Sequence, residues 1–213
     1  MISCLCITSK RRTKFREWLL WNYTKQSHCD RQLVVVSDDD DWPSWVKLKV
    51  VSSSLNVPQK RNIALDIVNS TMVTWFDDDD WQHPDKCRLL AESVIPGVVA
   101  GSTGSFFLSP RLMKKVDVSP GSLIFNSIGI MRDECPNFEE GTPVASDVEW
   151  MRVVLAGSRV HEIDKVLSFF LVHDDNISNK EQRIRPHVPV TIDELGEETW
   201  QAVKKLGKLL RED

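Results

Sequence analysis

Four consecutive aspartates, Asp77, Asp78, Asp79 and Asp80, follow the apolar and β-branched residues 72–76. Two carboxylates about 4 Å apart repel each other by roughly 4 kcal/mol at an effective dielectric constant of ~20, so a nearby positive charge is expected. Mn²⁺ and Mg²⁺ suit oxygen ligands; Mg²⁺ sites often use one or two carboxylates and leave other positions to phosphate and water. This acidic run 77–80 therefore predicts a divalent cation site that can neutralise a departing nucleotide diphosphate.

Two simpler interpretations of the acidic run 77–80 are a solvated loop and a calcium site. An EF-hand calcium loop needs ligands at alternate positions and a central glycine, and this spacing does not match it. A solvated loop fits less well, because the run lies between the apolar residue Phe76 and the sequence Trp81 to Pro84.

A second acidic run, residues 38–41, follows the apolar residues 33–36. Each of these apolar runs has the length and β-branched content of a buried strand. In open parallel sheets, ligands bind at the carboxyl ends of the strands, near the point where the strand order reverses. We therefore expect both acidic runs at the same edge of one sheet.

The hydrophobic pattern predicts a parallel α/β arrangement around these runs. A strand at residues 2–8, an amphipathic helix at 14–23 and a strand at 33–36 form one crossover unit. The further predicted elements are a strand at 46–51, a helix at 59–69, a strand at 72–76, a helix at 81–94, a mixed extension of the sheet at 98–132, a helix at 144–157, a strand pair at 160–172, a basic loop at 174–190 and a helix at 191–210.

Composition limits the class of protein. The chain has 213 residues, of which 41% are hydrophobic and 27% charged, as in ordinary globular domains. A net charge of -4 argues against nucleic acid as a partner, because such proteins usually carry a basic face. Five cysteines without a pair of CxxC motifs suggest neither a disulfide framework nor a zinc site. No stretch approaches the roughly 18 apolar residues of a transmembrane segment, so we expect a cytoplasmic protein.

Five sequence segments, in this order, resemble family 2 of the inverting glycosyltransferases with the GT-A fold. They are ISCLCITSKR, LVVVSDDDD, VPQKRNIALDIV, TWFDDDDWQHPDK, and ASDVEWMRVVLAG followed by FFLVHDDNIS. The resemblance spans about residues 1–178. In length and amino-acid sequence the chain also resembles the N-terminal glycosyltransferase domains of large algal-virus proteins. This resemblance would place the protein in a host cytoplasm, with further domains attached to the chain.

The resemblance implies an α/β fold of the GT-A type, with a mixed, mainly parallel central sheet flanked by helices. It also implies one GT-A domain over residues 1–213. Residues 1–100 would form the nucleotide-binding half, residues 101–178 the acceptor and catalytic half, and residues 179–213 a basic loop and a C-terminal helix.

The resemblance further implies contacts for a UDP-sugar donor. Thr8 and Asp38 would contact the uracil base, and Arg61 would lie near the diphosphate. Arg11 or Arg12 would assist Arg61 near the diphosphate. Trp81 is the best candidate for a flat surface on which a sugar ring stacks.

The cation ligands are implied in the same way. Asp77 and Asp79 match the two ends of the family's DxD motif, with Asp79 as the direct ligand and Asp77 contacting the ribose or the cation. The family usually has a small residue between them, whereas this chain has Asp78, which we place with the donor-binding residues. His173 matches a family histidine near the cation or the diphosphate, and a neutral imidazole can bind Mn²⁺.

Asp147 corresponds to the family's general base. An inverting displacement needs a carboxylate opposite the leaving diphosphate to take the proton of the acceptor hydroxyl, and such assistance typically contributes about 10² to 10⁴ in rate. Where the family usually has two adjacent acidic residues, this chain has Ser146 and Asp147. The simpler interpretation is an aspartate that interacts with a helix N-terminus.

Together these features predict a metal-dependent inverting glycosyltransferase, with Mn²⁺ or Mg²⁺ as cofactor. It would move a hexose or deoxyhexose from a UDP-sugar to a glycan, a glycoprotein or another hydroxyl acceptor. The alternatives are a noncatalytic sugar- or metal-binding module and another nucleotide-phosphate enzyme, such as a nucleotidyltransferase. The last would normally carry a glycine-rich phosphate loop, and the sequence SKRRTK after the first strand has no glycine.

Overall fold

The computed structural model describes residues 1–102, 104–109, 112–117, 123–141, 146–171, 188–189, 197 and 201. The strands are β1 (Ile2–Ile7), β2 (Arg31–Ser37), β3 (Lys47–Val50), β4 (Met72–Trp75), β5 (Trp81–Gln82), β6 (Val98–Gly101), β7 (Gly104–Ser109), β8 (Leu112–Asp117), β9 (Gly129–Met131), β10 (Arg159–Glu162), β11 (Ser168–Leu171) and β12 (Val188–Pro189). The helices are η1 (Lys10–Phe15), α1 (Arg16–Thr24), α2 (Val57–Ile67), α3 (Lys86–Ser93), η2 (Phe125–Ser127), η3 (Arg132–Glu134) and α4 (Ser146–Gly157).

The main sheet has seven strands in the order β10-β6-β9-β4-β1-β2-β3. Strand β1 lies between β2 and β4 and is parallel to both, whereas β9 runs antiparallel to β4 and β6. The predicted crossover unit at the start of the chain is therefore confirmed. The acidic runs 38–41 and 77–80 follow β2 and β4, so both lie at the carboxyl edge of the parallel strands.

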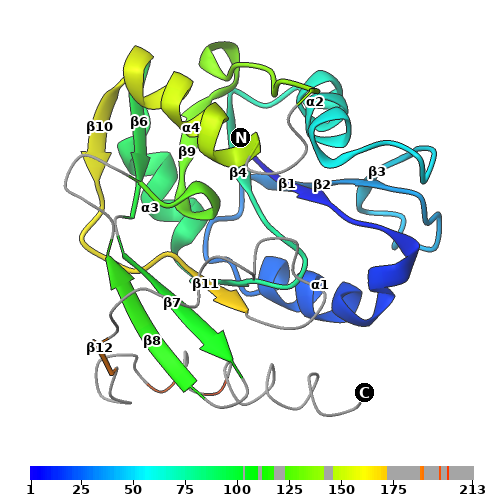
Figure 1. Ribbon diagram of the computed structural model, residues 1–213, viewed down its shortest axis with the longest axis horizontal. Coiled ribbons are helices and arrows are strands. Elements are labelled where there is room, and N and C mark those ends of the chain that lie inside the picture. Colours follow the sequence, from blue (N-terminus) through cyan, green and yellow to red (C-terminus); the bar gives the residue numbers. More distant parts are fainter. Residues whose placement is uncertain are drawn as a thin grey trace.

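Each face of the main sheet is covered by its own hydrophobic core. Along β1, Leu5 belongs to the core under α2 and α4, whereas Cys4 and Cys6 belong to the core under α1 and α3. This alternation is the period of two that a strand imposes on its side chains. Figure 1 shows α1 and α2 on opposite sides of strands β1 and β2.

Helix α2 begins at a capping box. The Asn56 side chain accepts a hydrogen bond from the Gln59 backbone N (2.9 Å), and the Gln59 side chain accepts one from the Asn56 backbone N (3.1 Å). These bonds satisfy backbone donors that a helix N-terminus leaves open, and Pro58 fits the first turn. The helix therefore starts at Val57, two residues before the predicted start.

A second, five-stranded sheet has the order β12-β8-β7-β11-β5. Strands β7 and β8 form an antiparallel ribbon beside the main sheet (Figure 1). The predicted helix in the segment 81–94 is present and begins at Lys86, after Pro84, whereas Trp81 and Gln82 pair with β11 as a short strand. The predicted elements at 174–190 and 191–210 lie almost entirely outside the described residues.

No helix in the described ranges has the length and apolar character needed to cross a membrane.

Candidate functional site

The acidic run 77–80 borders a cleft of about 290 Å³ at the carboxyl ends of β1 and β4. The cleft walls come from the turn between β1 and η1, the start of α2 and the loop after β4. The lining residues are Ile7, Thr8, Ser9, Arg12, Leu55, Val57, Lys60, Arg61, Asp77, Asp78 and Asp79. The sheet edge thus gathers three carboxylates and three cationic side chains around one cavity.

Asp78 and Asp79 share one guanidinium group. Arg12 donates from Nε to both carboxylate oxygens of Asp78 (2.9 and 3.0 Å), and its Nη2 lies 2.6 Å from Asp78 Oδ1 and 2.6 Å from Asp79 Oδ2. The Thr8 hydroxyl also donates to Asp78. Charge-assisted bonds with this forked geometry are among the stronger hydrogen bonds in proteins. Arg12 therefore supplies the positive charge that these two acids require.

Asp77 has no such partner. The structure gives the Asp77 carboxylate no hydrogen bond or ion pair within the described residues. Burial raises the pKa of Asp77 to about 6; the charge of Arg61 opposes the rise, and the carboxylates of Asp79, Asp78 and Asp147 add to it. Asp77 is thus a carboxylate whose negative charge lacks a direct counter-ion in the cleft.

Arg61 is buried in an aromatic box at the wall of the cleft. Its guanidinium carbon lies 4.5 Å from the Phe125 ring centre, 5.0 Å from that of Phe138 and 5.5 Å from that of Trp75. Nη1 donates to the Ser146 hydroxyl (3.3 Å), while Nε is buried without a hydrogen-bond partner in the described part of the chain. Burial lowers the pKa of Arg61. A buried guanidinium with an unused donor is suited to an anionic ligand.

Asp147 lies close to this group. It is half-buried in the first turn of α4, next to Ser146, which bonds to Arg61. The charge of Asp147 raises the pKa of both Arg61 and Asp77, which places the three side chains in one electrostatic neighbourhood. The proposed base and the acidic run are therefore brought together by elements far apart in the sequence.

Asp80 serves the scaffold instead of the cleft. Its carboxylate accepts a hydrogen bond from Asn126 Nδ2, and its backbone carbonyl accepts bonds from Trp18 Nε1 (3.0 Å) and Asn22 Nδ2 (3.3 Å). All four residues are buried. The fourth aspartate thus fixes the loop that presents the other three.

Lys86 holds the same loop from below. It is fully buried, and Nζ donates to the backbone carbonyl of Trp75 (2.6 Å), to Gln82 Oε1 (2.7 Å) and to the backbone carbonyl of Asn126. Burial lowers the pKa of Lys86 to about 8. Lys86 therefore ties the end of β4 to β5 and η2.

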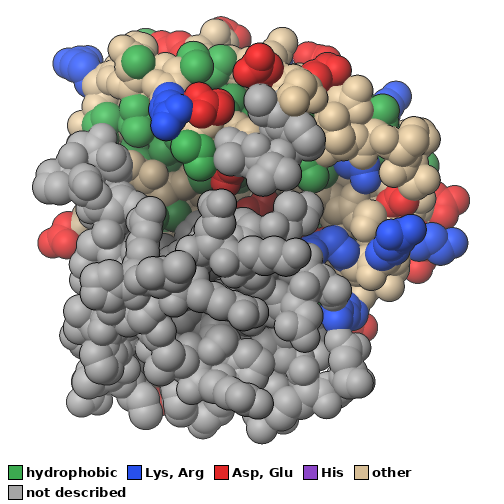
Figure 2. Space-filling view, viewed as in Figure 1, with side chains coloured by type: hydrophobic (Ala, Val, Ile, Leu, Met, Phe, Trp, Pro, Cys, Tyr) green, Lys and Arg blue, Asp and Glu red, His purple; other side chains and the backbone are tan. Residues whose placement is uncertain are grey.

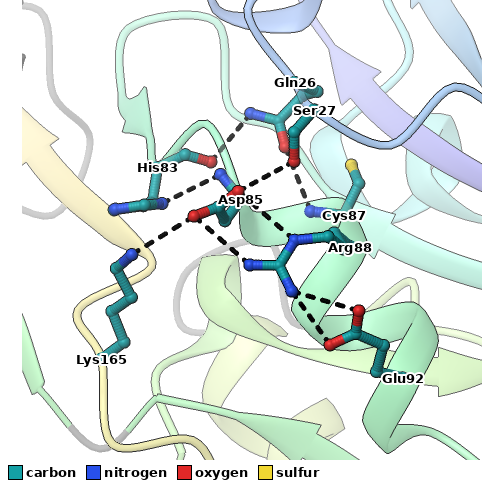
Figure 3. A network of polar contacts seen from close by, with 8 residues as sticks. All are labelled: Gln26, Ser27, His83, Asp85, Cys87, Arg88, Glu92 and Lys165. Atoms are coloured by element: carbon teal, nitrogen blue, oxygen red, sulfur yellow. Dashed lines mark hydrogen bonds and ion pairs between the residues drawn. The ribbon is translucent and has the colours of Figure 1, made fainter.

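The segment after the acidic run is fixed by a polar network that Figure 3 shows. Asp85 accepts hydrogen bonds from Ser27 (2.9 Å), Arg88 (3.4 Å) and Lys165 (3.4 Å). Burial opposes ionisation, but these bonds lower the pKa of Asp85 to about 2. Burial lowers the pKa of His83 to about 4, so its neutral Nδ1 accepts a bond from the Asp85 backbone N (2.9 Å). The network joins the loop after α1, the N-terminal part of α3 and the loop before β11.

The acidic run 38–41 has a different set of partners. Asp38 is half-buried and accepts a hydrogen bond from the Lys10 backbone N (2.8 Å). Arg16 forms ion pairs with Asp39 and with Asp41, the latter at 2.6 Å. Basic and acidic side chains lie side by side at the right-hand edge of Figure 2, where η1 and the loop after β2 lie in Figure 1. Asp38 lies near the first turn of η1 and is not a lining residue of the cleft.

The structure places five of the expected site residues in the cleft lining, and Asp147 close by. The five are Thr8, Arg61, Asp77, Asp78 and Asp79. Of the two arginines considered for the diphosphate, Arg12 lines the cleft and Arg11 is exposed on η1. His173 lies outside the described residues. The proposal that Trp81 stacks on a sugar is wrong, because its side chain is only 1% exposed in β5.

Lys60 lines the cleft, although it is not among the site residues predicted from the sequence. It is buried and donates from Nζ to the backbone carbonyl of Thr8 (3.2 Å). The sequence pattern could have indicated Lys60, because Lys60 and Arg61 are adjacent cationic residues in the first half of an amphipathic helix near the sheet edge.

A cation site of three protein ligands is not preformed in the described ranges. No group of three or more His, Cys, Asp or Glu side chains there is arranged to hold a metal ion. The oxygen chemistry of Asp77 and Asp79 still fits a cation that takes one or two carboxylates. The unpaired charge of Asp77 supports that fit.

Comparison with known proteins finds likeness at the level of structure. No family model matches the sequence, and no curated protein matches it. The crystal structure of S. aureus TarS 1-349 in complex with UDP-GlcNAc aligns with a TM-score of 0.63 at 16% identity, covering 96% of this chain and 66% of that chain. The structure of TarS 1-349 with UDP gives a TM-score of 0.59 at 17% identity, covering 80% and 60%. A crystal structure of TarS gives 0.60 at 17% identity, covering 80% of this chain and 36% of that chain.

These alignments confirm the predicted fold class, a mixed α/β fold with a mainly parallel sheet flanked by helices, like that of TarS. This chain spans only part of each of these TarS chains, from 36% to 66%. The similarity to algal-virus domains gains no support from these bacterial structures and stays a prediction. At such low identity the likeness shows the fold alone, and function has to be argued from the site.

Proposed function

We propose that this chain is an inverting glycosyltransferase that uses a UDP-sugar donor and Mn²⁺ or Mg²⁺. The observation that carries the proposal is the cleft in which Asp77, Asp78 and Asp79 meet Arg12 and Arg61 at the carboxyl edge of β1 and β4. Asp147 lies within electrostatic reach of that cleft. The likeness in fold to TarS, whose structures include complexes with UDP and UDP-GlcNAc, supports the choice of donor.

In this proposal the donor is bound by residues that line the cleft, together with Asp38 at the end of β2, outside the lining. Thr8 and Asp38, at the ends of β1 and β2, contact the uracil base, and a carboxylate that accepts the ring N–H favours uridine over purines. Arg61, with its unused Nε, and Lys60 bind the diphosphate. Each is preorganised by packing or by a backbone contact, which lowers the entropic cost of binding.

Asp79 and Asp77 would hold the divalent cation, with the remaining ligands from the diphosphate and water. His173 is a further ligand on the family resemblance alone. A bound cation would neutralise charge that develops on the leaving diphosphate. The unpaired carboxylate of Asp77 is the structural reason to expect a cation here.

Asp147 is the proposed general base. It accepts the proton of the acceptor hydroxyl as that oxygen attacks the sugar from the face opposite the diphosphate. Arg61 keeps α4 in place through Ser146, so the base and the diphosphate site are positioned by the same side chain. The acceptor would be a glycan, a glycoprotein or another hydroxyl compound.

A donor screen tests this function without knowledge of the acceptor. The purified chain is incubated with UDP-, GDP- and dTDP-sugars, with Mn²⁺ or with EDTA, and release of free nucleotide is measured. We expect slow release from a UDP-sugar that depends on the metal. Equal release from all three donors would contradict the uridine assignment, and no release from any donor together with tight sugar binding would favour a noncatalytic module.

A further inference from the structure

Arg12 occupies the carboxylates that the proposed function assigns to the donor and the cation. Its Nη2 lies 2.6 Å from an oxygen of Asp78 and 2.6 Å from an oxygen of Asp79. The Arg12 side chain is 23% exposed, whereas those of Asp78 and Asp79 are 4% and 10% exposed. The guanidinium is thus the more accessible partner of this cluster, and it bridges two neighbouring acids.

A divalent cation and this guanidinium compete for the same oxygen. A cation bound to Asp79 Oδ2 would meet Arg12 Nη2 at contact distance, and two positive groups that close repel each other strongly. Asp78 keeps a second donor in Thr8 and retains a hydrogen bond if Arg12 leaves. Release of Arg12 therefore removes its contact with Asp79 Oδ2 and leaves Asp78 with the hydrogen bond from Thr8.

The neighbouring cations are not suited to this exchange. Arg16 is engaged by Asp39 and Asp41, and Arg61 is enclosed by aromatic rings and Ser146. Arg11 is exposed and lies outside the cleft lining. Arg12 stands on the short helix η1, where its backbone departs from helical geometry (φ -108°, ψ 19°). Its long side chain can reach either the acids or a ligand in the cleft that it lines.

We infer that Arg12 is an internal counter-ion that exchanges partners: it neutralises Asp78 and Asp79 in the ligand-free chain, yields Asp79 to a divalent cation, and then binds the donor diphosphate. The inference rests on the proposed function. It adds that cation and nucleotide bind cooperatively, because the cation displaces a guanidinium that finds a new partner only when the diphosphate is present. Such coupling is reciprocal, so each ligand raises the affinity for the other by the same factor.

The test measures Mn²⁺ binding by electron paramagnetic resonance and UDP binding by calorimetry, each with and without the other ligand. The proteins are the wild-type chain, Arg12→Ala, and Arg11→Ala as the matched control on the same helix. Arg12→Ala should bind Mn²⁺ alone at least about fivefold tighter than wild type, since typical couplings between sites start near that factor. Its affinity for UDP in saturating Mn²⁺ should fall by a similar factor. Arg11→Ala should match wild type in both.

Arg12→Lys covers the case in which Arg12→Ala does not fold. An ammonium group is a single point charge and lacks the fork that bridges two carboxylates. Arg12→Lys should therefore also bind Mn²⁺ alone more tightly than wild type, by a smaller factor than Arg12→Ala.

The outcomes separate this inference from the proposed function. Unchanged Mn²⁺ affinity in both Arg12 variants overturns the inference, while cooperative binding of UDP and Mn²⁺ to the wild type would leave the proposed function standing. A wild-type chain that binds neither ligand overturns both.

Discussion

Asp77 stands apart from its neighbours in the acidic run, because Asp78 and Asp79 pair with Arg12 whereas Asp77 has no ion pair in the described part of the chain. Its pKa is raised from 3.8 to about 6. The folded chain therefore holds a proton on this group more tightly than the unfolded chain does. The resulting contribution to stability is fully present below pH 3.8 and is lost as the pH rises through about 6. At neutral pH the ionised carboxylate of Asp77 therefore destabilises the ligand-free protein.

Asp77→Asn should stabilise the ligand-free protein at pH 7. Each pKa unit corresponds to ~1.4 kcal/mol, so the shift implies a gain in the free energy of unfolding of at most about 3 kcal/mol. The gain should disappear near pH 4, where the wild-type group is protonated. Urea unfolding at the two pH values measures it, with the exposed Asp40→Asn as control. A loss of stability at pH 7 would show that Asp77 has a partner that stabilises its charge.

Asp147→Asn should separate chemistry from binding. Loss of the proton acceptor should lower kcat by about 10² to 10⁴, while the UDP affinity stays near the wild-type value. Glu149→Gln is the matched control, because Glu149 lies in the same first turn of α4 but is exposed and paired with Arg152 (2.6 Å). Equal turnover in Asp147→Asn and wild type would remove Asp147 from the mechanism.

At the scale of elements, the loop after β4 is held by buried polar residues from distant parts of the chain. Asn126 in η2 donates to Asp80 and accepts a hydrogen bond from the Ser168 hydroxyl (2.7 Å). Lys86 in α3 binds the backbone carbonyls of Trp75 and Asn126. The site geometry therefore depends on how η2, α3 and β11 dock beneath the acidic run.

Asn126→Ala should weaken both the fold and the site. It removes the buried hydrogen bonds that Asn126 makes with the Asp80 carboxylate and with the Ser168 hydroxyl. A hydrogen bond to a charged group contributes about 1.5–3 kcal/mol and a neutral one about 0.5–1.5 kcal/mol. We expect a loss of roughly 2–4 kcal/mol in the free energy of unfolding and a weaker affinity for UDP with Mn²⁺. Chemical denaturation and calorimetry measure the two effects. An unchanged UDP affinity in a destabilised variant would show that the loop does not need this support.

For the whole molecule, the sequence was most informative where local pattern decides structure. The apolar runs of β1, β2 and β4 predicted parallel strands, and the acidic runs at their ends lie at one sheet edge, as expected. The short strand at Trp81 and Gln82 was not predicted, because it exists only through its pairing with β11, which lies far away in the sequence. The division of the chain into functional parts at residues 100 and 178 stays a prediction.

The contacts that distinguish site residues from scaffold depend on tertiary structure. Arg11 and Arg12 are neighbours on a short helix, and only the position of η1 against the cleft makes Arg12 the partner of Asp78. Asp80 is one of four identical residues, and its scaffold role comes from Asn126, 46 positions away. Periodicity in a single sequence carries no information on either contact.

On the proposed function, the cleft at the edge of β1 and β4 binds a nucleotide diphosphate together with a divalent cation. Crystals soaked with UDP and MnCl₂ test it through an anomalous difference map recorded at the manganese edge. We expect a manganese peak beside Asp79 or Asp77, with the UDP diphosphate next to Arg61. A cleft that holds neither manganese nor UDP, under conditions where both saturate the crystal, would contradict it.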